Sequence, residues 1–329
     1  MDLLFLETLG KPLWMWLAFV LLIAALLAFD LGILHRKARE IGARESLYLS
    51  AFYIGLGLAF AGWVWHALGE QAALLYLTGF VVEKSLAMDN IFVIAMIFAY
   101  FGTPRALQHR VLVYGILGVI VLRALMIGAG TAIIAEFGWV LYLFAAFLVF
   151  TGVKMLMTAD SDYDVGSSRV LRFLRRHLRV TDGHHGDRFF VRLPATGGGR
   201  GVLYATPLFL ALVCVEFADV IFAVDSIPAI FAITTDPFIV YTSNIFAILG
   251  LRALYFALAA MIHRFVYLRH ALAAVLVFIG GKIFVADMLG LAKIPPAMSL
   301  SVTLTILAAG ILASLWSTRR SSGTSEERA

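Results

Sequence analysis

Cysteine and charge are both scarce in this chain. Cys214 is the single cysteine among 329 residues, which excludes an intrachain disulfide framework and a cysteine-based metal cluster. Charged residues make up 14% of the sequence, whereas soluble globular chains carry about 25%. Hydrophobic residues make up 62%, and the mean hydropathy is +0.93. Because an apolar excess of this size needs lipid as its solvent, the sequence predicts an all-α polytopic membrane protein.

Motifs of the common enzyme classes are also missing. The sequence has no His-Glu-x-x-His, no Gly-x-Ser-x-Gly and no P-loop, so we expect neither an enzyme nor a resident cofactor. An intramembrane aspartyl protease is the enzyme class that this absence leaves open. The net charge of +5 does not indicate nucleic acid, because most basic residues lie in short segments between apolar runs. That placement is typical of membrane topology.

Nine apolar runs are long enough to cross a bilayer, which takes about 20 mostly apolar residues per helix. The first run lacks a cationic leader and a clear small-residue cleavage site, so we expect a retained helix rather than a signal peptide. The two longest runs leave room for a bend or a split. The runs are Leu13–Leu34, Leu47–Leu68, Ala72–Phe101, Val111–Ile134, Trp139–Met157, Val202–Ile233, Phe238–Ile262, Ala271–Leu289 and Met298–Trp316.

The segments between these runs differ in charge. Every second segment is rich in arginine and lysine, whereas the alternate segments hold nearly no positive charge. Short loops rich in Lys and Arg stay on the cytoplasmic side, so we expect the N-terminus outside and the C-terminus in the cytoplasm. The basic segments contain Arg36, Lys37 and Arg39, then Arg105 and Arg110, then the five arginines of 169–179, then Arg264 and Arg269, and finally Arg319 and Arg320.

The longest polar segment is residues 158–201. Its Arg-rich stretch Arg169–Arg179 has interleaved hydrophobic residues, which is typical of an amphipathic helix at a membrane surface. Asp187–Arg192 and the glycines after it indicate a small hairpin. We interpret the segment as a cytoplasmic linker on the membrane surface. A regulatory or metal-sensing role for His184 and His185 is the alternative.

Three features occur twice in the same order along the chain. Each unit has an acidic pair six residues apart, then Leu-Arg-Ala-Leu in the next apolar run, then Gly-x-Lys in the run after that. Because each unit holds three runs, the two units must have inverted topologies, an arrangement that places a substrate site at the midplane of many transporters. The features are Glu83 with Asp89, Leu122–Leu125 and Gly152–Lys154, then Asp219 with Asp225, Leu251–Leu254 and Gly280–Lys282.

The repeat divides the chain into five parts, in which the helices outside the repeat have a scaffold role. We expect two N-terminal helices at 1–70, a first repeat at 71–157, a cytoplasmic loop at 158–201, a second repeat at 202–290, and a last helix with a cytoplasmic tail at 291–329.

Charged residues inside the apolar runs point to a cation site. Each one costs at least about 2.5–3.5 kcal/mol in the hydrocarbon region, so they normally face a cavity or one another. Five acids and three basic residues leave a formal charge of −2, which one divalent cation would neutralise. The acids are Glu83, Asp89, Glu216, Asp219 and Asp225, and the basic residues are Arg123, Arg252 and Lys84.

Pro228 is expected to bring these acids together. Glu216 and Asp219 share one helical face, but Asp225 would point elsewhere on a regular helix. A proline clashes with the carbonyl four residues before it, so we predict a broken helix near Pro228 that returns Asp225 towards Asp219 and frees carbonyl oxygens as ligands.

The neutral donors near these acids are Asn90, Ser226 and Asn244. Oxygen donors of this kind suit Mg²⁺, Ca²⁺ or Mn²⁺. Met88 is either a packing residue or a soft ligand that would favour Mn²⁺.

The other charged residues have supporting interpretations. Arg123 and Arg252 are expected to anchor the carboxylates rather than to touch the substrate. Lys154 and Lys282 lie towards the ends of their runs, where lysines can snorkel. Asp30 is either an entrance ligand or an exposed end residue. For the whole set, the alternative is a group of salt bridges that only holds the bundle together, although buried ion pairs contribute little to stability.

Four stretches of the chain resemble the signatures of the TerC/Alx family of integral membrane proteins. The resemblance runs from about Phe29 to Lys282. It implies a bacterial inner-membrane protein associated with manganese export and, by older naming, with tellurium resistance, whose acidic motifs belong to the metal pathway. The stretches are Val215–Phe231, Glu83–Asn90, Ser243–Phe256 and Phe29-Asp30.

The residues and the resemblance together favour a secondary transporter. The hypothesis is export of a divalent cation, first of all Mn²⁺, by alternating access at a midplane carboxylate site, in exchange for protons. Glu83, Asp89, Asn90, Glu216, Asp219, Asp225 and Ser226 would line that site. The alternative is a non-transporting membrane scaffold of a metal or tellurite stress-resistance complex, which would dock partners on residues 158–201.

Overall fold

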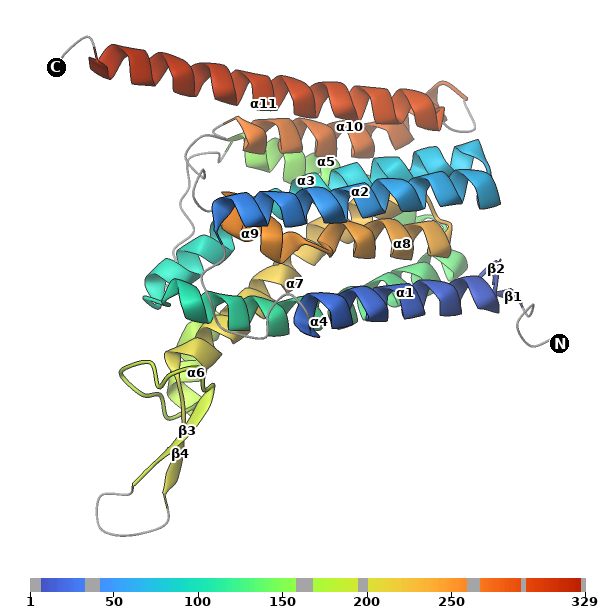
Figure 1. Ribbon diagram of the computed structural model, residues 1–329. Coiled ribbons are helices and arrows are strands. Elements are labelled where there is room, and N and C mark those ends of the chain that lie inside the picture. The colour runs from blue at the N-terminus through green and yellow to red at the C-terminus, as the bar shows by residue number, and fades with distance from the viewer. Residues whose placement is uncertain are drawn as a thin grey trace.

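The computed structural model describes residues 7–32, 42–157, 168–194, 201–258, 267–290 and 294–326, without the side chains of 31, 32, 43, 89 and 318–326. These residues form long helices that run side by side (Figure 1). The helices are α1 (Leu13–Gly32), α2 (Ala43–Leu68), α3 (Glu70–Tyr100), α4 (Arg105–Glu136), α5 (Val140–Met157), α6 (Arg169–His177), α7 (Pro207–Ile233), α8 (Pro237–Ile248), α9 (Leu251–Leu258), α10 (Leu268–Met288) and α11 (Pro296–Glu326). The strands are β1 (Glu7–Thr8), β2 (Lys11–Pro12), β3 (Phe190–Leu193) and β4 (Val202–Ala205).

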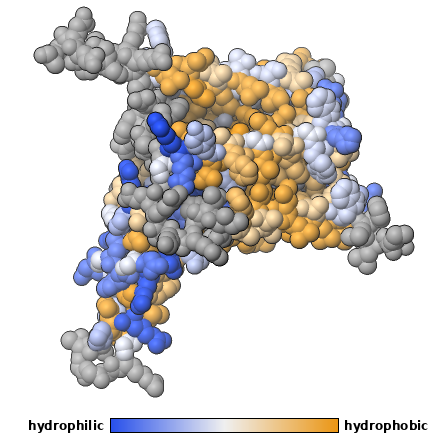
Figure 2. All heavy atoms as spheres, in the orientation of Figure 1, coloured by the Kyte–Doolittle hydropathy of each residue, from blue (hydrophilic) through white to orange (hydrophobic). Residues whose placement is uncertain are grey.

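Eight segments of the described residues are long and apolar enough to cross a membrane, with α8 and α9 together forming one of them. The prediction of a helical multi-pass membrane protein is therefore confirmed. The third predicted run, Ala72–Phe101, corresponds to α3, which is 31 residues long and contains Glu83, Lys84 and Asp89. It is not among the eight, so the count of nine stays a prediction. Figure 2 shows hydrophobic residues over the middle of the bundle and hydrophilic residues towards its ends.

The break that we expected near Pro228 is not found there. Helix α7 continues through Pro228 to Ile233. A proline removes one backbone hydrogen bond, and neighbouring helices can accommodate that loss inside a membrane bundle. The next span is broken instead: α8 ends at Ile248, and Leu249 and Gly250, the latter with φ +77°, form a turn before α9 begins at Leu251.

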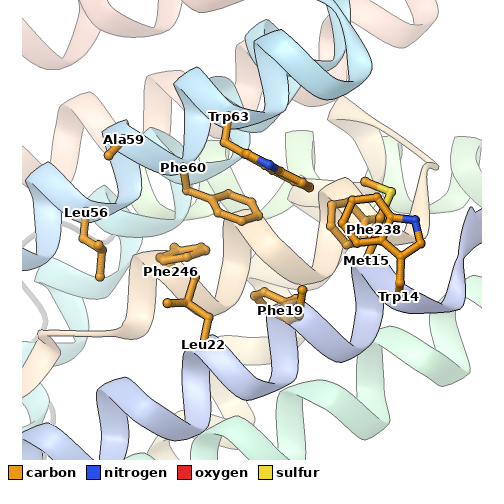
Figure 3. A pocket seen from close by; sticks show the side chains of 11 residues that line it. Trp14, Met15, Phe19, Leu22, Leu56, Ala59, Phe60, Trp63, Phe238 and Phe246 are labelled. Carbon is orange, nitrogen blue, oxygen red and sulfur yellow. The ribbon is translucent and has the colours of Figure 1, made fainter. Parts of the chain in front are cut away.

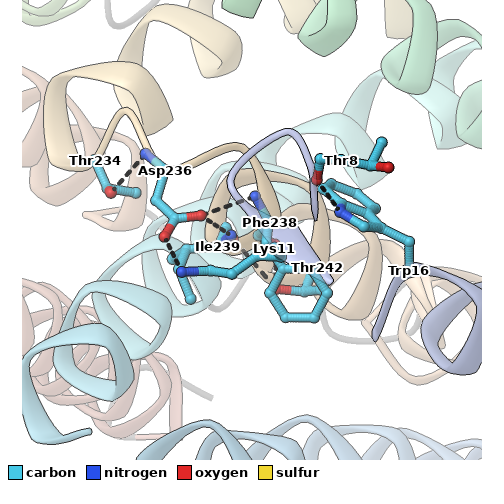
Figure 4. Close-up of polar contacts among 8 residues, drawn as sticks. All are labelled: Thr8, Lys11, Trp16, Thr234, Asp236, Phe238, Ile239 and Thr242. Carbon is cyan, nitrogen blue, oxygen red and sulfur yellow. Dashed lines mark hydrogen bonds and ion pairs between the residues drawn. The ribbon is translucent and has the colours of Figure 1, made fainter. Parts of the chain in front are cut away.

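Helix α8 begins at a side-chain cap. The Asp236 carboxylate accepts hydrogen bonds from the backbone N–H groups of Phe238 and Ile239, at 3.0 and 3.3 Å. The same carboxylate forms an ion pair with Lys11 of β2 at 3.0 Å, as Figure 4 shows. The N-terminal β1–β2 hairpin is thereby attached to the start of α8, more than 200 residues later in the chain.

The segment between α5 and α7 contains the helix and the hairpin that the sequence predicts. α6 covers Arg169–His177, and β3 pairs with β4 in an antiparallel hairpin. Figure 1 shows these elements protruding from one end of the bundle. His184 contacts the carbonyl oxygen of Phe101 through Nε2 at 3.1 Å, and Arg110 of α4 forms an ion pair with Asp187. The acidic start of the segment and the glycines of the hairpin turn lie outside the described residues.

Helices α5 and α10 cross at two glycines. A Cβ atom at Gly152 would lie 2.7 Å from the carbonyl oxygen of Ala273, and a Cβ atom at Gly280 would lie 2.5 Å from that of Ala145. Gly152 lies seven residues after Ala145, which Gly280 contacts, and Gly280 lies seven residues after Ala273, which Gly152 contacts. The two helices therefore meet in a reciprocal contact. Both glycines belong to the Gly-x-Lys feature of the sequence repeat.

Replacing Gly280 by alanine is expected to lower the free energy of unfolding by about 1–3 kcal/mol, as overpacking of a filled interior does. The added Cβ would meet a backbone carbonyl, which cannot rotate away. Gly281 is the matched control, because a Cβ atom there meets nothing within 4 Å. Thermal unfolding in one detergent would compare the two alanine variants. Equal melting temperatures of the Gly280→Ala and Gly281→Ala variants would contradict the close crossing of α5 and α10.

Candidate functional site

A buried ion pair lies among the central helices. Arg123 of α4 forms it with Glu83 of α3, and each side chain is 3% exposed. The same guanidinium nitrogen donates to Ser226 Oγ of α7 at 3.0 Å and to Asn244 Oδ1 of α8 at 3.3 Å. One arginine therefore connects four helices. Asp219 of α7 is also buried, at 6% exposure, and lies within electrostatic range of Arg123 and Glu83.

In the described part of the chain, the buried polar groups at Arg123 that lack a hydrogen-bond partner are donors. Arg123 Nε and Asn244 Nδ2 are buried and have no hydrogen-bond partner among the described residues. A cation needs oxygen acceptors, so this side of the ion pair is unsuited to hold one directly. Arg123 forms the ion pair with Glu83, and its predicted role, as an anchor for a carboxylate rather than a contact for the substrate, stays a prediction.

Oxygen acceptors gather around a cavity of about 60 Å³ that Arg123 also lines. Thr151 Oγ1 lies 3.4 Å from Asp225 Oδ1, to which it donates a hydrogen bond. Since one water occupies about 30 Å³ in the liquid, the cavity has room for a small cation and about one water. Its polar lining is Asn90, Arg123, Thr151, Asp225 and Ser226, and its apolar lining is Leu86, Met155, Phe222 and Leu276.

Thr151 is a site residue that the sequence reasoning missed. Hydroxyl residues are common in membrane helices, and its one sequence signal is its position directly before Gly152-Val153-Lys154. Asn90, Asp225 and Ser226 were predicted, and the structure places all three at the cavity. Asp89 precedes Asn90 in the chain, but its side chain lies outside the described residues.

Glu216 lies apart from this cavity. It packs against α4 at Gly118, where an added Cβ atom would lie 2.1 Å from Glu216 Oε1. Its side chain is half-buried and within electrostatic range of Asp219. Among the described side chains, no three His, Cys, Asp or Glu residues converge in a way that could hold a metal. A common site for all five predicted acids therefore stays a prediction, as does the metal-sensing role of His184 and His185.

Arg252 has partners other than the acids of α7. It forms an ion pair with Asp30 of α1, and its Nη1 lies 2.9 Å from Nε2 of His109 in α4. The Asp30 side chain is 14% exposed and also interacts with the Tyr53 hydroxyl. Asp30 is thus a paired and mostly buried residue rather than an exposed helix end.

The three lysines lie in different surroundings. Lys84 Nζ donates to the backbone carbonyls of Ala247 and Leu249. Lys282 Nζ donates to Ser299 Oγ of α11 at 3.0 Å. Lys154 is exposed and lies within electrostatic range of Asp225. Of the three, Lys154 is therefore the one that faces the carboxylate of the cavity.

A larger cavity of about 320 Å³ lies between α1, α2 and α8. Figure 3 shows that aromatic rings dominate its wall, among them Phe19, Phe60, Trp63 and Phe246. None of the described residues that line it carries a charge. An unpaired cation would lose its hydration there without gaining ligands, so we place no ion in this cavity.

The chain is similar to known membrane proteins over most of its length. The profile of the integral membrane protein TerC family matches residues 68–322. A relative from Salmonella typhi is 48% identical over 319 residues, which cover 94% of this chain and 96% of the relative. A relative from Photorhabdus laumondii is 45% identical over 319 residues, which cover 94% of this chain and 97% of the relative. Both carry the provisional name membrane-bound redox modulator Alx.

An uncharacterized membrane protein of Rickettsia felis is 45% identical over 300 residues, which cover 91% of this chain and 97% of that protein. No solved structure matches this chain significantly. The family match thus covers α3 to α10, well beyond the four sequence stretches. The chain belongs to the TerC family of integral membrane proteins.

Proposed function

We propose that this protein is a secondary transporter that exports a divalent metal cation, with Mn²⁺ as the first candidate. The observation that carries the proposal is the cavity beside Arg123, where one carboxylate and three neutral oxygen-bearing side chains line a space of about 60 Å³. Asp225, Asn90, Thr151 and Ser226 would contribute the ligands. Carboxylate, amide and hydroxyl oxygens are the donors that Mg²⁺, Ca²⁺ and Mn²⁺ prefer.

The charges around the cavity support a divalent ion. Asp225 and Arg123 line the cavity, and Glu83 and Asp219 lie within electrostatic range of Arg123. When ionised these four groups have a charge of −2, whereas the Lys84 ammonium group bonds to the carbonyls of Ala247 and Leu249 instead. The exposed Lys154 is better screened by solvent. Met155 in the cavity wall adds a soft sulfur, which favours Mn²⁺ over Mg²⁺ and Ca²⁺.

Transport would proceed by alternating access between two inverted repeats. The reciprocal contact of Gly152 and Gly280 supports the repeat, because a two-fold relation between α5 and α10 produces such a pair of contacts. An inside-negative potential of 100 mV opposes the exit of a divalent cation by about 4.6 kcal/mol. We therefore propose proton exchange as the driving reaction, with the protein in the bacterial inner membrane, its N-terminus outside and its C-terminus in the cytoplasm.

Uptake of Mn²⁺ into proteoliposomes tests this function. We expect flux above that of protein-free liposomes, competition by other hard divalent cations, and proton movement in the opposite direction. Radioactive Mn²⁺ and an internal pH dye would record the two fluxes, with Mg²⁺, Ca²⁺ and Zn²⁺ as competitors. Absence of flux for every divalent cation, from protein that elutes as a single folded species, would contradict the proposal.

A second candidate is a membrane scaffold. The observation that favours it is the protruding segment of α6, β3 and β4, which carries several arginines and an exposed Phe173. The names of the relatives suggest a redox role. A thiol-based redox reaction uses a pair of thiols, and this chain has the single buried Cys214. Loss of a cellular resistance phenotype on deletion of residues 158–201, together with an intact phenotype in Asp225→Asn, would favour the scaffold.

A further inference from the structure

Lys84 occupies an unusual place for a buried charge. It follows Glu83 in α3 and is 6% exposed, yet it does not join the ion pair that Glu83 makes with Arg123. Its ammonium group instead donates to the carbonyl oxygens of Ala247 at 2.9 Å and Leu249 at 3.2 Å. Both acceptors belong to the C-terminal end of α8.

These carbonyls are available because the span is broken. α8 ends at Ile248, and a turn follows in which Leu249 has φ −54° and ψ 133° and Gly250 has φ +77°. The last carbonyls of a helix have no partner within the helix, and they carry the negative end of its dipole. In a membrane interior such groups must find a partner inside the protein.

The break cannot close into a continuous helix without a change in packing. Tyr53 of α2 lies against Gly250, where an added Cβ atom would be 2.7 Å from the Tyr53 side chain. The positive φ of Gly250 is the left-handed conformation that glycine tolerates best. In this conformation the Ala247 and Leu249 carbonyls are directed at Lys84 of α3.

We infer that the break between α8 and α9 is a site for a monovalent cation, and that the chain fills this site with its own Lys84 ammonium group. Carbonyls at unwound helix ends coordinate monovalent ions in several transporter folds. Here a tethered cation supplies the same charge and three N–H donors. It stays attached to α3 and cannot leave with the substrate.

A consequence concerns the coupling ion, and this part rests on the proposed transport function. A site that is permanently filled by Lys84 cannot bind and release Na⁺. Transport by the unmodified protein should then be the same in sodium and in choline buffers. The assignment of the site itself does not depend on transport.

Chemical rescue of Lys84→Ala tests the site. The purified full chain would be unfolded thermally in NaCl, methylammonium chloride and choline chloride at equal ionic strength. We expect Lys84→Ala to melt several degrees below the unmodified protein, and to regain most of the difference in methylammonium or Na⁺ but not in choline. Equal behaviour in all three salts would overturn the inference.

Lys282→Ala is the matched control. Lys282 is a second lysine within a membrane span, but its ammonium group donates to the Ser299 hydroxyl instead of to helix-end carbonyls. We expect this variant to show no selective rescue by small cations. Selective rescue of the same size in Lys282→Ala would show that the effect is not specific to the helix break.

Two further variants test the inference about Lys84 if Lys84→Ala does not fold. Lys84→Arg keeps the positive charge, whereas Lys84→Met keeps much of the volume without the charge. We expect Lys84→Arg to melt well above Lys84→Met. A Lys84→Met protein as stable as the unmodified chain would overturn the inference. Because these are measurements of stability, their outcome is separate from a failure to find Mn²⁺ transport.

Discussion

Replacing Asp225 by asparagine is expected to lower Mn²⁺ uptake into proteoliposomes by at least about 100-fold, which corresponds to about 2.7 kcal/mol. Among the described side chains, Asp225 is the carboxylate that lines the cavity, and the other side chains that offer oxygen atoms to the cavity are neutral. An asparagine keeps the shape but removes the charge that attracts a hard cation. Initial rates at several Mn²⁺ concentrations would separate weaker binding from slower turnover.

One control and one second site variant accompany Asp225→Asn. Asp287 is an exposed aspartate near the end of α10, so Asp287→Asn makes the same chemical change outside the cavity and should leave uptake unchanged. Thr151→Val removes the hydroxyl that bonds to Asp225, and a loss of about tenfold is expected, as for other groups that orient a metal ligand. Full uptake in Asp225→Asn would remove the cavity as the cation site.

Replacing Arg123 by methionine is expected to lower the free energy of unfolding by about 3–5 kcal/mol. The variant would leave Glu83 as a buried charge without its partner, and would remove the bonds from Arg123 to Ser226 and Asn244. Denaturant titration in mixed micelles would measure the change.

The double variant Arg123→Met with Glu83→Gln tests the reason for this loss. Replacing both charges by neutral groups of similar volume removes the uncompensated carboxylate, so most of the stability should return. Arg110→Met is the surface control, since the Arg110–Asp187 pair is 37% and 60% exposed and should contribute less than about 1 kcal/mol. A double variant as unstable as Arg123→Met would contradict the explanation.

Hydropathy was enough to predict most of the fold, because a membrane span is a property of about 20 consecutive residues. The break in the span was assigned to the wrong place. Pro228 has a local stereochemical cost that can be read from the sequence, but the bundle accommodates it within α7. The break at Gly250 uses a positive φ that glycine tolerates best, but the sequence has many glycines within its apolar runs, and the packing of Tyr53 against this one has no signature in the local sequence.

The charged residues of the site could also be identified from the sequence, but their partners could not. Helical periodicity says where a side chain points on its own helix and does not say which helix it meets. Lys84 was predicted as a charge partner of the carboxylates. Its ammonium group instead bonds to the carbonyls of Ala247 and Leu249, at the break between α8 and α9. Arg252 carries the same repeated motif as Arg123, yet its carboxylate partner is Asp30 of α1. Such pairings depend on the order of helices in the bundle.

The two ion pairs of the N-terminal segment have a consequence for biosynthesis. Lys11 pairs with Asp236, and Asp30 pairs with Arg252, 222 residues later in the chain. At about 5–20 residues per second, a ribosome needs roughly 10–45 s to make the residues between the members of each pair. During this time α1 has neither ionic partner, so lipid or the insertion machinery must hold it. Helix α1 is therefore synthesised early, but the two ion pairs of this N-terminal segment form only after most of the chain has been made.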